Sequence, residues 1–215
     1  MPARTIAFLC EKGGAGKSTN TVNLASCLSV KYGKRVLIID HDPQASASKW
    51  SALRPENDGP GEIAVIVMKK LQRDLRSVSH GFDYVIVDGA PTTDEVTMDA
   101  IKIAELVIIP VQPSGFDVWA GINTADLVRQ RQEITDGKPN ARVLVSRAIV
   151  KTVIARDIHE ALASYSLPLM KNRTHNRVQF AETVSVGKST LDLPQGDQAR
   201  AEIEAIAAEV LEILG

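Results

Sequence analysis

Short runs of apolar, mostly β-branched residues recur along the chain, and each run is bounded by residues that favour turns. They are Thr5–Cys10, Arg35–Ile39, Tyr84–Val87, Leu106–Val111 and Arg142–Val145. Unbroken apolar runs of this length, without polar alternation, are typical of strands that are buried on both faces. The pattern therefore predicts a sheet in the interior of the molecule.

Longer segments between these runs place apolar residues at the spacing of an α-helix. Helices are expected at Ser18–Val30, Ile63–Val78, Thr93–Ala104, Asp117–Ile134, Arg156–Tyr165 and Gln198–Leu214. Strands that alternate with helices imply βαβ units. The predicted fold class is α/β, a mostly parallel twisted sheet flanked by helices.

Composition supports one ordinary globular domain spanning 1–215. The chain has 44% hydrophobic and 24% charged residues, which is enough to bury a core and excludes a disordered or fibrous protein. Its only cysteines, Cys10 and Cys27, lie too far apart for a CxxC metal motif and do not suggest a disulfide scaffold. The sequence shows neither a signal peptide nor a run long enough to span a membrane, so a cytoplasmic protein is expected.

A glycine-rich loop carries the clearest chemical signal. The sequence Lys-Gly-Gly-Ala-Gly-Lys-Ser-Thr at 12–19 follows the first predicted strand and opens the first predicted helix. Glycines let consecutive backbone N–H groups turn toward an anion at a helix N-terminus. Lys17 would then reach the β- and γ-phosphates, and the Ser18 hydroxyl would bind Mg²⁺. The alternative, a plain glycine turn, does not explain this placement between strand and helix.

The loop departs from the usual phosphate-loop pattern, because Glu11 replaces its first glycine and Lys12 adds a second lysine. This arrangement resembles the deviant Walker A loop of the ParA/MinD family of ATPases. Three further blocks extend the resemblance over nearly the whole chain, at Val36–Gln44, Phe82–Pro91 and Leu106–Ser114. The resemblance implies a P-loop fold and a nucleotide site that includes Gly13, Gly14, Ala15, Gly16, Lys17, Ser18 and Thr19.

Three aspartates stand at or near the ends of predicted strands. Asp40 and Asp42 follow Val36–Ile39, and Asp88 follows Tyr84–Val87. Parallel α/β sheets bind ligands at the carboxyl edge, where such side chains would meet a nucleotide and Mg²⁺. The resemblance assigns Asp42 to positioning the hydrolytic water, and Asp40 and Asp88 to the Mg²⁺ site. For each, a simple turn aspartate is the alternative.

The resemblance also implies roles for residues that their own pattern does not define. Pro113, Ser146 and Arg147 occupy stretches that line the adenine in relatives, although Arg147 could equally be a surface residue. Lys12 matches the family's signature lysine, which implies a homodimer with ATP in which Lys12 contacts the partner's phosphates. Spacing alone leaves open a solvated surface lysine.

Charge is distributed unevenly over a chain whose formal net charge is only −1. Nine Lys or Arg residues against three acids occupy 138–188, whereas six acids against Arg200 alone occupy 189–215. The basic stripe, defined as Lys171, Arg173, Arg177 and Lys188, could bind DNA phosphates without reading sequence, or could be a solvated face. The acidic C-terminal helix does not suit an anionic membrane.

Together these features favour a Mg²⁺-dependent ATPase, weakly active alone, that acts as a dimerisation switch. The phosphate loop begins so early that no N-terminal helix-turn-helix domain is expected, as in small ParA-type proteins. The resemblance implies plasmid or chromosome partitioning through non-specific nucleoid DNA binding, with release by a ParB-like partner that stimulates hydrolysis. Positioning of protein cargo, such as carboxysomes or chemotaxis clusters, is one alternative. A metabolic ATP-dependent ligase is another.

Overall fold

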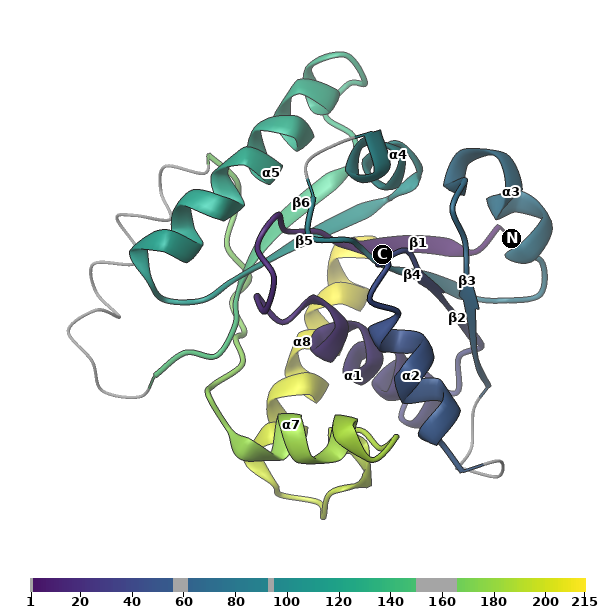
Figure 1. The fold of residues 1–215 in the computed structure, drawn as a ribbon, viewed down its shortest axis with the longest axis vertical. Helices are drawn as coiled ribbons and strands as arrows, with labels where there is room; N and C mark the ends of the chain where they lie inside the picture. Colours follow the sequence, from purple (N-terminus) through teal and green to yellow (C-terminus); the bar gives the residue numbers. More distant parts are fainter. Residues whose placement is uncertain (1, 56–61, 93–94, 150–165) are drawn as a thin grey trace.

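The computed structural model contains a six-stranded parallel sheet with the strand order β3-β2-β4-β1-β5-β6 (Figure 1). It describes residues 2–55, 62–92, 95–149 and 166–215, and only the backbone of 115–118. The strands are β1 (Arg4–Phe8), β2 (Val36–Asp40), β3 (Ile63–Val67), β4 (Tyr84–Asp88), β5 (Leu106–Val111) and β6 (Asn140–Val145). Every pairing between them is parallel, which confirms the predicted α/β class.

Helices cover both faces of this sheet (Figure 1). On one face lie α1 (Lys17–Val30), α2 (Ser46–Leu53), α7 (Val178–Ser185), the short 3₁₀ helix η1 (Thr190–Asp192) and α8 (Gln198–Leu214). On the other lie α3 (Leu71–Val78), α4 (Glu95–Ile103) and α5 (Gly115–Glu133). No helix among the described residues is long and apolar enough to cross a membrane.

The alternation of side chains along each strand divides the core into two layers. Along β1, Ile6 and Phe8 pack toward α1 and α8, whereas Ala7 and the following Leu9 pack toward α4 and α5. All four side chains are buried. Because successive strand residues point to opposite faces, a sheet covered on both sides needs an unbroken apolar run. That requirement explains the sequence pattern.

The predicted helix at Ile63–Val78 is wrong in its first part. Ile63–Val67 forms the edge strand β3, which pairs with β2 from Val36↔Ile63 to Asp40↔Val67, and only Leu71–Val78 is helical. Five consecutive apolar residues, four of them β-branched, favour a strand over the helix that the apolar spacing suggested. The pattern also missed α2 and α7. The predicted helix Arg156–Tyr165 lies outside the described residues.

The pairing register brings the ends of three strands together. Asp88 at the end of β4 lies opposite Phe8 of β1 on one side and Asp40 of β2 on the other. Each aspartate is the last residue of its strand, so it belongs to the sheet and not to the turn that follows. The carboxyl edge of the sheet therefore presents two neighbouring carboxylates beside the loop that follows β1.

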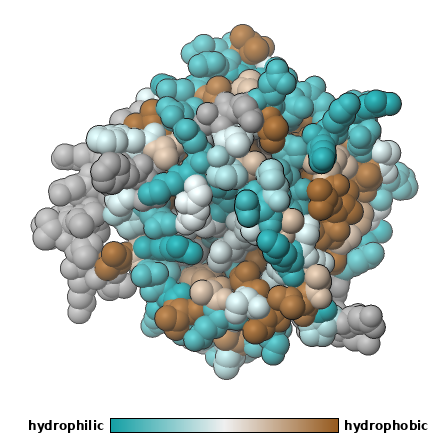
Figure 2. All heavy atoms as spheres, in the orientation of Figure 1, coloured by the Kyte–Doolittle hydropathy of each residue, from teal (hydrophilic) through white to brown (hydrophobic). Residues whose placement is uncertain are grey.

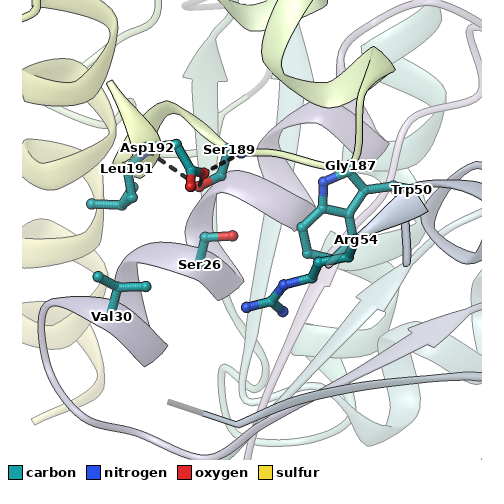
Figure 3. Close-up of a pocket in the computed structure, with 8 residues that line it drawn as sticks. All are labelled: Ser26, Val30, Trp50, Arg54, Gly187, Ser189, Leu191 and Asp192. Carbon is teal, nitrogen blue, oxygen red and sulfur yellow. Dashed lines mark hydrogen bonds between the residues drawn. The ribbon is translucent and has the colours of Figure 1, made fainter. Parts of the chain in front are cut away.

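Helix α2, which follows these carboxylates in the chain, is attached to the loop after α7. The Trp50 indole N–H donates a hydrogen bond of 2.8 Å to the Lys188 carbonyl oxygen, and the Arg54 guanidinium lies over the Trp50 ring at 5.3 Å. Gly187 lies against α2 so closely that a Cβ there would be 2.4 Å from the Leu53 carbonyl carbon. Figure 3 shows Trp50, Arg54 and Gly187 around the small pocket that this contact forms.

Candidate nucleotide site

The glycine loop turns through backbone conformations that favour glycine. Gly14 has φ 79° and Gly16 has φ 100°, both in the left-handed region. A Cβ on Gly16 would be 2.7 Å from Ser146 Oγ and 3.2 Å from Asn20 Nδ2. At this position a side chain is thus disfavoured twice, by backbone strain and by contact. Gly16 then caps the N-terminus of α1, where the helix dipole favours an anion.

Lys17 lies within the curve of this loop and is 6% exposed. Its Nζ donates hydrogen bonds to the carbonyl oxygens of Cys10 at 2.9 Å and Lys12 at 3.1 Å. Burial lowers the pKa of the Lys17 ammonium, while nearby groups that include Asp88 and Asp42 favour its charged form. The loop thus directs a cation toward its own centre, where a phosphate chain would lie.

Asp88 is fully buried at the end of β4. Burial raises the pKa of its carboxyl group to about 7, with the Ser18 hydrogen bond opposing and the neighbouring Asp40 adding to the shift. Its Oδ1 accepts a 3.5 Å hydrogen bond from Thr21 Oγ1, whereas Oδ2 has no hydrogen-bond partner among the residues that the structure describes. A buried oxygen without a partner is costly unless a ligand completes it.

The Asp88 carboxylate and the Ser18 hydroxyl therefore fit a Mg²⁺ ion. Mg²⁺ prefers oxygen ligands, and P-loop sites supply them as one hydroxyl and one acid at the end of a strand. When bound, the ion would neutralise charge on the phosphates. The next residue, Gly89, lies so close to β1 that a Cβ there would be 2.5 Å from Leu9 Cδ2 and 2.7 Å from the Phe8 carbonyl oxygen. This position therefore favours glycine.

Asp40 has a different environment from that of Asp88. Its Oδ2 accepts hydrogen bonds of 2.7 Å from both the backbone N–H and the hydroxyl of Ser48, and its Oδ1 accepts a 3.3 Å bond from the Asp42 N–H. Both carboxylate oxygens thus bind the start of α2 and the turn before it. This geometry suits a residue that positions Asp42. The predicted role of Asp40 at the Mg²⁺ site remains a prediction.

A pocket of about 380 Å³ lies over the loop. Of the predicted site residues, its walls include Gly13, Gly14, Gly16, Lys17, Ser18, Thr19, Asp42 and Arg147. The sequence analysis missed five other lining residues, Val22, Gln44, Ser46, Pro91 and Val184. Of these, Gln44 and Pro91 stand in the quoted blocks that follow Asp40 and Asp88, which was the available signal. Ser46 and Val184 enter through the unpredicted helices α2 and α7.

The remaining predicted residues stand behind this pocket or beside it. Ala15, Asp40 and Asp88 are buried and are not among the residues that line the pocket. Ser146 accepts hydrogen bonds of 3.4 Å from Asn20 and from Thr174. Pro113 does not line the pocket, but its neighbour Gln112 donates a 2.6 Å hydrogen bond to the Gly14 carbonyl oxygen. Ser146 and Gln112 thus brace the loop from β6 and from the turn after β5.

Glu11 and Lys12 distinguish this loop from the usual phosphate loop. Glu11 accepts a 2.7 Å hydrogen bond from Asn123 Nδ2 of α5, which explains how an acid can replace the expected glycine. Lys12 is half-exposed and is not among the residues that line the pocket. Its predicted contact with a second subunit remains a prediction.

The acidic helix α8 neutralises part of the basic stripe. Arg177 donates to Glu202 through Nε at 2.8 Å and through Nη2 at 2.7 Å, and Lys171 Nζ lies 3.7 Å from a Glu212 oxygen. Lys188 is exposed and Arg173 is half-buried. Two of the four predicted DNA-binding side chains therefore already have a carboxylate partner.

A parallel sheet with a phosphate loop after its first strand and an acid at the end of β4 defines a P-loop nucleotide-binding protein. A family model described as an AAA domain matches residues 3–68 and 62–140, well over half of the chain. With the homologues and structures described below, this match establishes that the chain belongs to the ParA/MinD family of P-loop ATPases.

Individual relatives agree with this assignment. The chain is 25% identical to "Maintenance of carboxysome distribution protein A" of Halothiobacillus neapolitanus over 97% of both chains. It is 29% identical to "Chromosome-partitioning ATPase Soj" of Thermus thermophilus over 86% of both. The solved ATP complex of a McdA variant from Cyanothece has a TM-score of 0.79 at 18% identity and covers 99% of this chain and 96% of that one.

Proposed function

We propose that this ATPase is a dimerisation switch that partitions cargo over nucleoid DNA. In the ATP state two copies join through their nucleotide sites and bind DNA without sequence preference, and a partner protein that carries the cargo stimulates hydrolysis and releases them. The observation that carries the proposal is the pair of lysines in one loop. Lys17 points into the loop, whereas Lys12 lies outside the pocket.

The chemistry assigned to each residue follows from its place. Backbone N–H groups of Gly13 to Ser18 and the Lys17 ammonium would hold the phosphates and compensate their charge. Mg²⁺ would be held by Ser18 and Asp88. Asp42 lines the same pocket and would orient the attacking water. Lys12 would add positive charge from the second subunit as transfer proceeds, which explains why one copy alone should hydrolyse ATP slowly.

Two kinds of cargo remain candidates. Plasmid or chromosome partitioning is the first, supported by the Thermus relative named for chromosome partitioning. A protein assembly such as a carboxysome is the second, and it has its own support, because the Halothiobacillus relative named for carboxysome distribution matches over nearly its whole length. Both cargoes would use the same switch and the same cytoplasmic, nucleoid-associated location.

Binding to random-sequence DNA in the presence of ATP, ADP or no nucleotide tests the proposal. With Mg²⁺-ATP we expect binding and a molecular mass of two chains, and with ADP neither. The Lys17→Ala variant serves as the matched control, because it removes the phosphate contact and should show neither property with any nucleotide. A wild-type protein that stays monomeric with ATP and modifies a small metabolite instead would contradict the proposal and favour the metabolic alternative.

A further inference from the structure

The amino edge of the sheet, opposite the phosphate loop, carries an open groove of about 1100 Å³. Its walls are built where strands begin. Arg4 opens β1, Arg35 precedes β2, Asp83 precedes β4 and Glu105 precedes β5. Arg76 near the end of α3 completes one side. The groove is thus a feature of the sheet's frame and is separate from the nucleotide pocket.

Positive charge in this groove exceeds what its acids neutralise. Arg4 Nη1 lies 3.0 Å from a Glu105 oxygen, and Arg35 contacts Asp83 through its backbone N–H at 2.8 Å and its Nε at 3.9 Å. These two pairs account for both acids that line the groove.

Two further groove residues, Lys34 and Arg76, add positive charge. Among the residues that the structure describes, neither has a carboxylate within 4 Å. Lys34 lies before β2 and Arg76 in α3, so these charges line the groove from two separate parts of the chain.

Helix α3 extends this positive charge along the outside of the molecule. Leu71, Leu75 and Val78 pack toward the sheet, which leaves the basic residues facing outward. Segment 69–80 holds four basic residues against one acid, and the basic ones, Lys69, Lys70, Arg73 and Arg76, are all exposed. Figure 2 shows hydrophilic side chains over α3, beside a hydrophobic patch over β3.

We infer that the amino-edge groove and the outer face of α3 form a binding surface for the phosphate backbone of double-stranded DNA. Free lysine and arginine side chains spread over an open surface suit a polyanion, because each one that meets a phosphate releases counterions. The basic stripe predicted from sequence is less suited, since Arg177 and Lys171 already face glutamates. This inference rests on the proposed function, in which the ATP-bound dimer binds DNA.

The position of the surface fits that function. Two copies that meet through their phosphate loops would cover the carboxyl edges of both sheets. Their amino edges would face away from the contact and stay open to a long duplex. Because the two surfaces of such a dimer would point away from each other, each would bind its own stretch of DNA, and a long DNA molecule could be held at two separate stretches.

The test compares two double charge reversals in the full chain. Lys34→Glu with Arg76→Glu removes the free groove charges, and Lys171→Glu with Lys188→Glu removes the exposed end charges of the stripe. Retention of a random 60-base-pair duplex is measured with Mg²⁺-ATP as salt is raised. We expect the groove variant to lose roughly tenfold or more in affinity and to flatten the salt slope by about 2, whereas the stripe variant keeps the wild-type slope.

Four outcomes decide the inference. If the groove variant retains wild-type binding and slope, or only the stripe variant loses binding, this surface is wrong while the proposed function stands. If the wild-type protein binds no DNA with ATP, the proposed function itself fails. If a groove variant with the wild-type melting temperature keeps its affinity for DNA but binds inorganic phosphate less tightly, the groove is a site for a small anion. That result would overturn the inference.

Discussion

At the scale of single residues, the sequence indicated residues that line the pocket more readily than the contacts that support them. Lys17, Ser18 and Asp42 all line it, and they could be selected because the loop and the strand ends are local in sequence. Asn20 and Ser146 could not be assigned their bracing contacts, since the 3.4 Å bond between them joins positions 126 apart and depends on where β6 lies. Asp40 and Ser48 are only eight positions apart, but their hydrogen bond depends on α2, a helix that the sequence pattern did not predict.

Replacement of Gly16 by alanine tests whether the loop needs a residue without a Cβ. We expect Gly16→Ala to weaken ATP binding by roughly tenfold or more, because left-handed backbone costs alanine about 1 to 2 kcal/mol before the contact with Ser146 Oγ is counted. The double variant Gly16→Ala with Ser146→Ala removes that oxygen and should recover part of the loss. Titration with a fluorescent ATP analogue measures both. Unchanged affinity in the single variant would show that the loop tolerates a side chain.

Asp42 gives the sharpest separation of binding from hydrolysis. It lines the pocket, and among the described residues its side chain accepts a single hydrogen bond, of 2.8 Å from the Gln44 N–H to Oδ1. We expect Asp42→Ala to lower ATP turnover by about 100-fold or more, the usual scale for a lost proton-accepting group, while the ATP-bound dimer persists. Asp40→Ala should instead weaken both, because α2 loses its anchor. Equal turnover in Asp42→Ala and wild type would remove Asp42 from the mechanism.

At the scale of elements, periodicity located five of the six strands, including β6 at one edge of the sheet, and failed at β3, the other edge. β1, β2, β4, β5 and β6 come from short, mainly apolar runs that are flanked by turns. β3 lies at the edge and joins α3 within a few residues, so its apolar residues continued the helical spacing of Leu71, Leu75 and Val78. α2 and α7 are helices of only eight residues, and tertiary contacts such as Trp50 to Lys188 fix them more than propensity does.

The attachment of α2 to the loop after α7 predicts a large difference between two glycines. Gly187 has φ 74° and lies against Leu53, whereas Gly196 has φ 94° and nothing within 4 Å of its missing Cβ. Gly187→Ala should lower the free energy of unfolding by about 3 to 5 kcal/mol, and Gly196→Ala by about 1 to 2 kcal/mol from backbone strain alone. Urea unfolding measures the difference. Equal losses would show that the contact with α2 does not stabilise the fold.

An ion pair between α1 and α8 makes part of the stability depend on pH. Glu204 contacts Lys31 and Arg200, and these hydrogen bonds lower the pKa of the Glu204 carboxyl group from 4.5. Its contribution is therefore complete above the unfolded-state pKa and is lost as pH falls through the lower folded-state value. At pH 7 Glu204→Gln should be less stable by no more than about 1 kcal/mol, because the pair is partly exposed.

Below pH 4.5 this difference in the free energy of unfolding should shrink. Glu133 is exposed and does not belong to this ion pair, so Glu133→Gln serves as the control. Its free energy of unfolding should follow that of the wild type at every pH. A difference for Glu204→Gln that stays constant from pH 7 to pH 3 would exclude the ion pair as its cause.

At the scale of the whole molecule, function depends on which surfaces face outward. The net charge of −1 does not show how charge is distributed over the surface. Acids of α8 pair with the basic stripe, whereas α3 and the amino edge of the sheet carry positive charge in excess of their acids. Charge counts along the sequence predicted the stripe and missed the groove, because the groove collects residues from four strand beginnings. Only the fold shows that the phosphate loop and this groove occupy opposite edges of one sheet.

The central claim is that Lys12 of one copy completes the nucleotide site of the other, and mixing two inactive variants tests it directly. Lys12→Ala keeps Asp42 but lacks the outer cation, and Asp42→Ala supplies that cation but cannot orient water. Neither alone should turn over ATP at the wild-type rate. Mixed in equal amounts, they should recover about a quarter of it, because about half of the dimers are mixed and each has one complete site. A mixture no more active than its separate components would contradict the account.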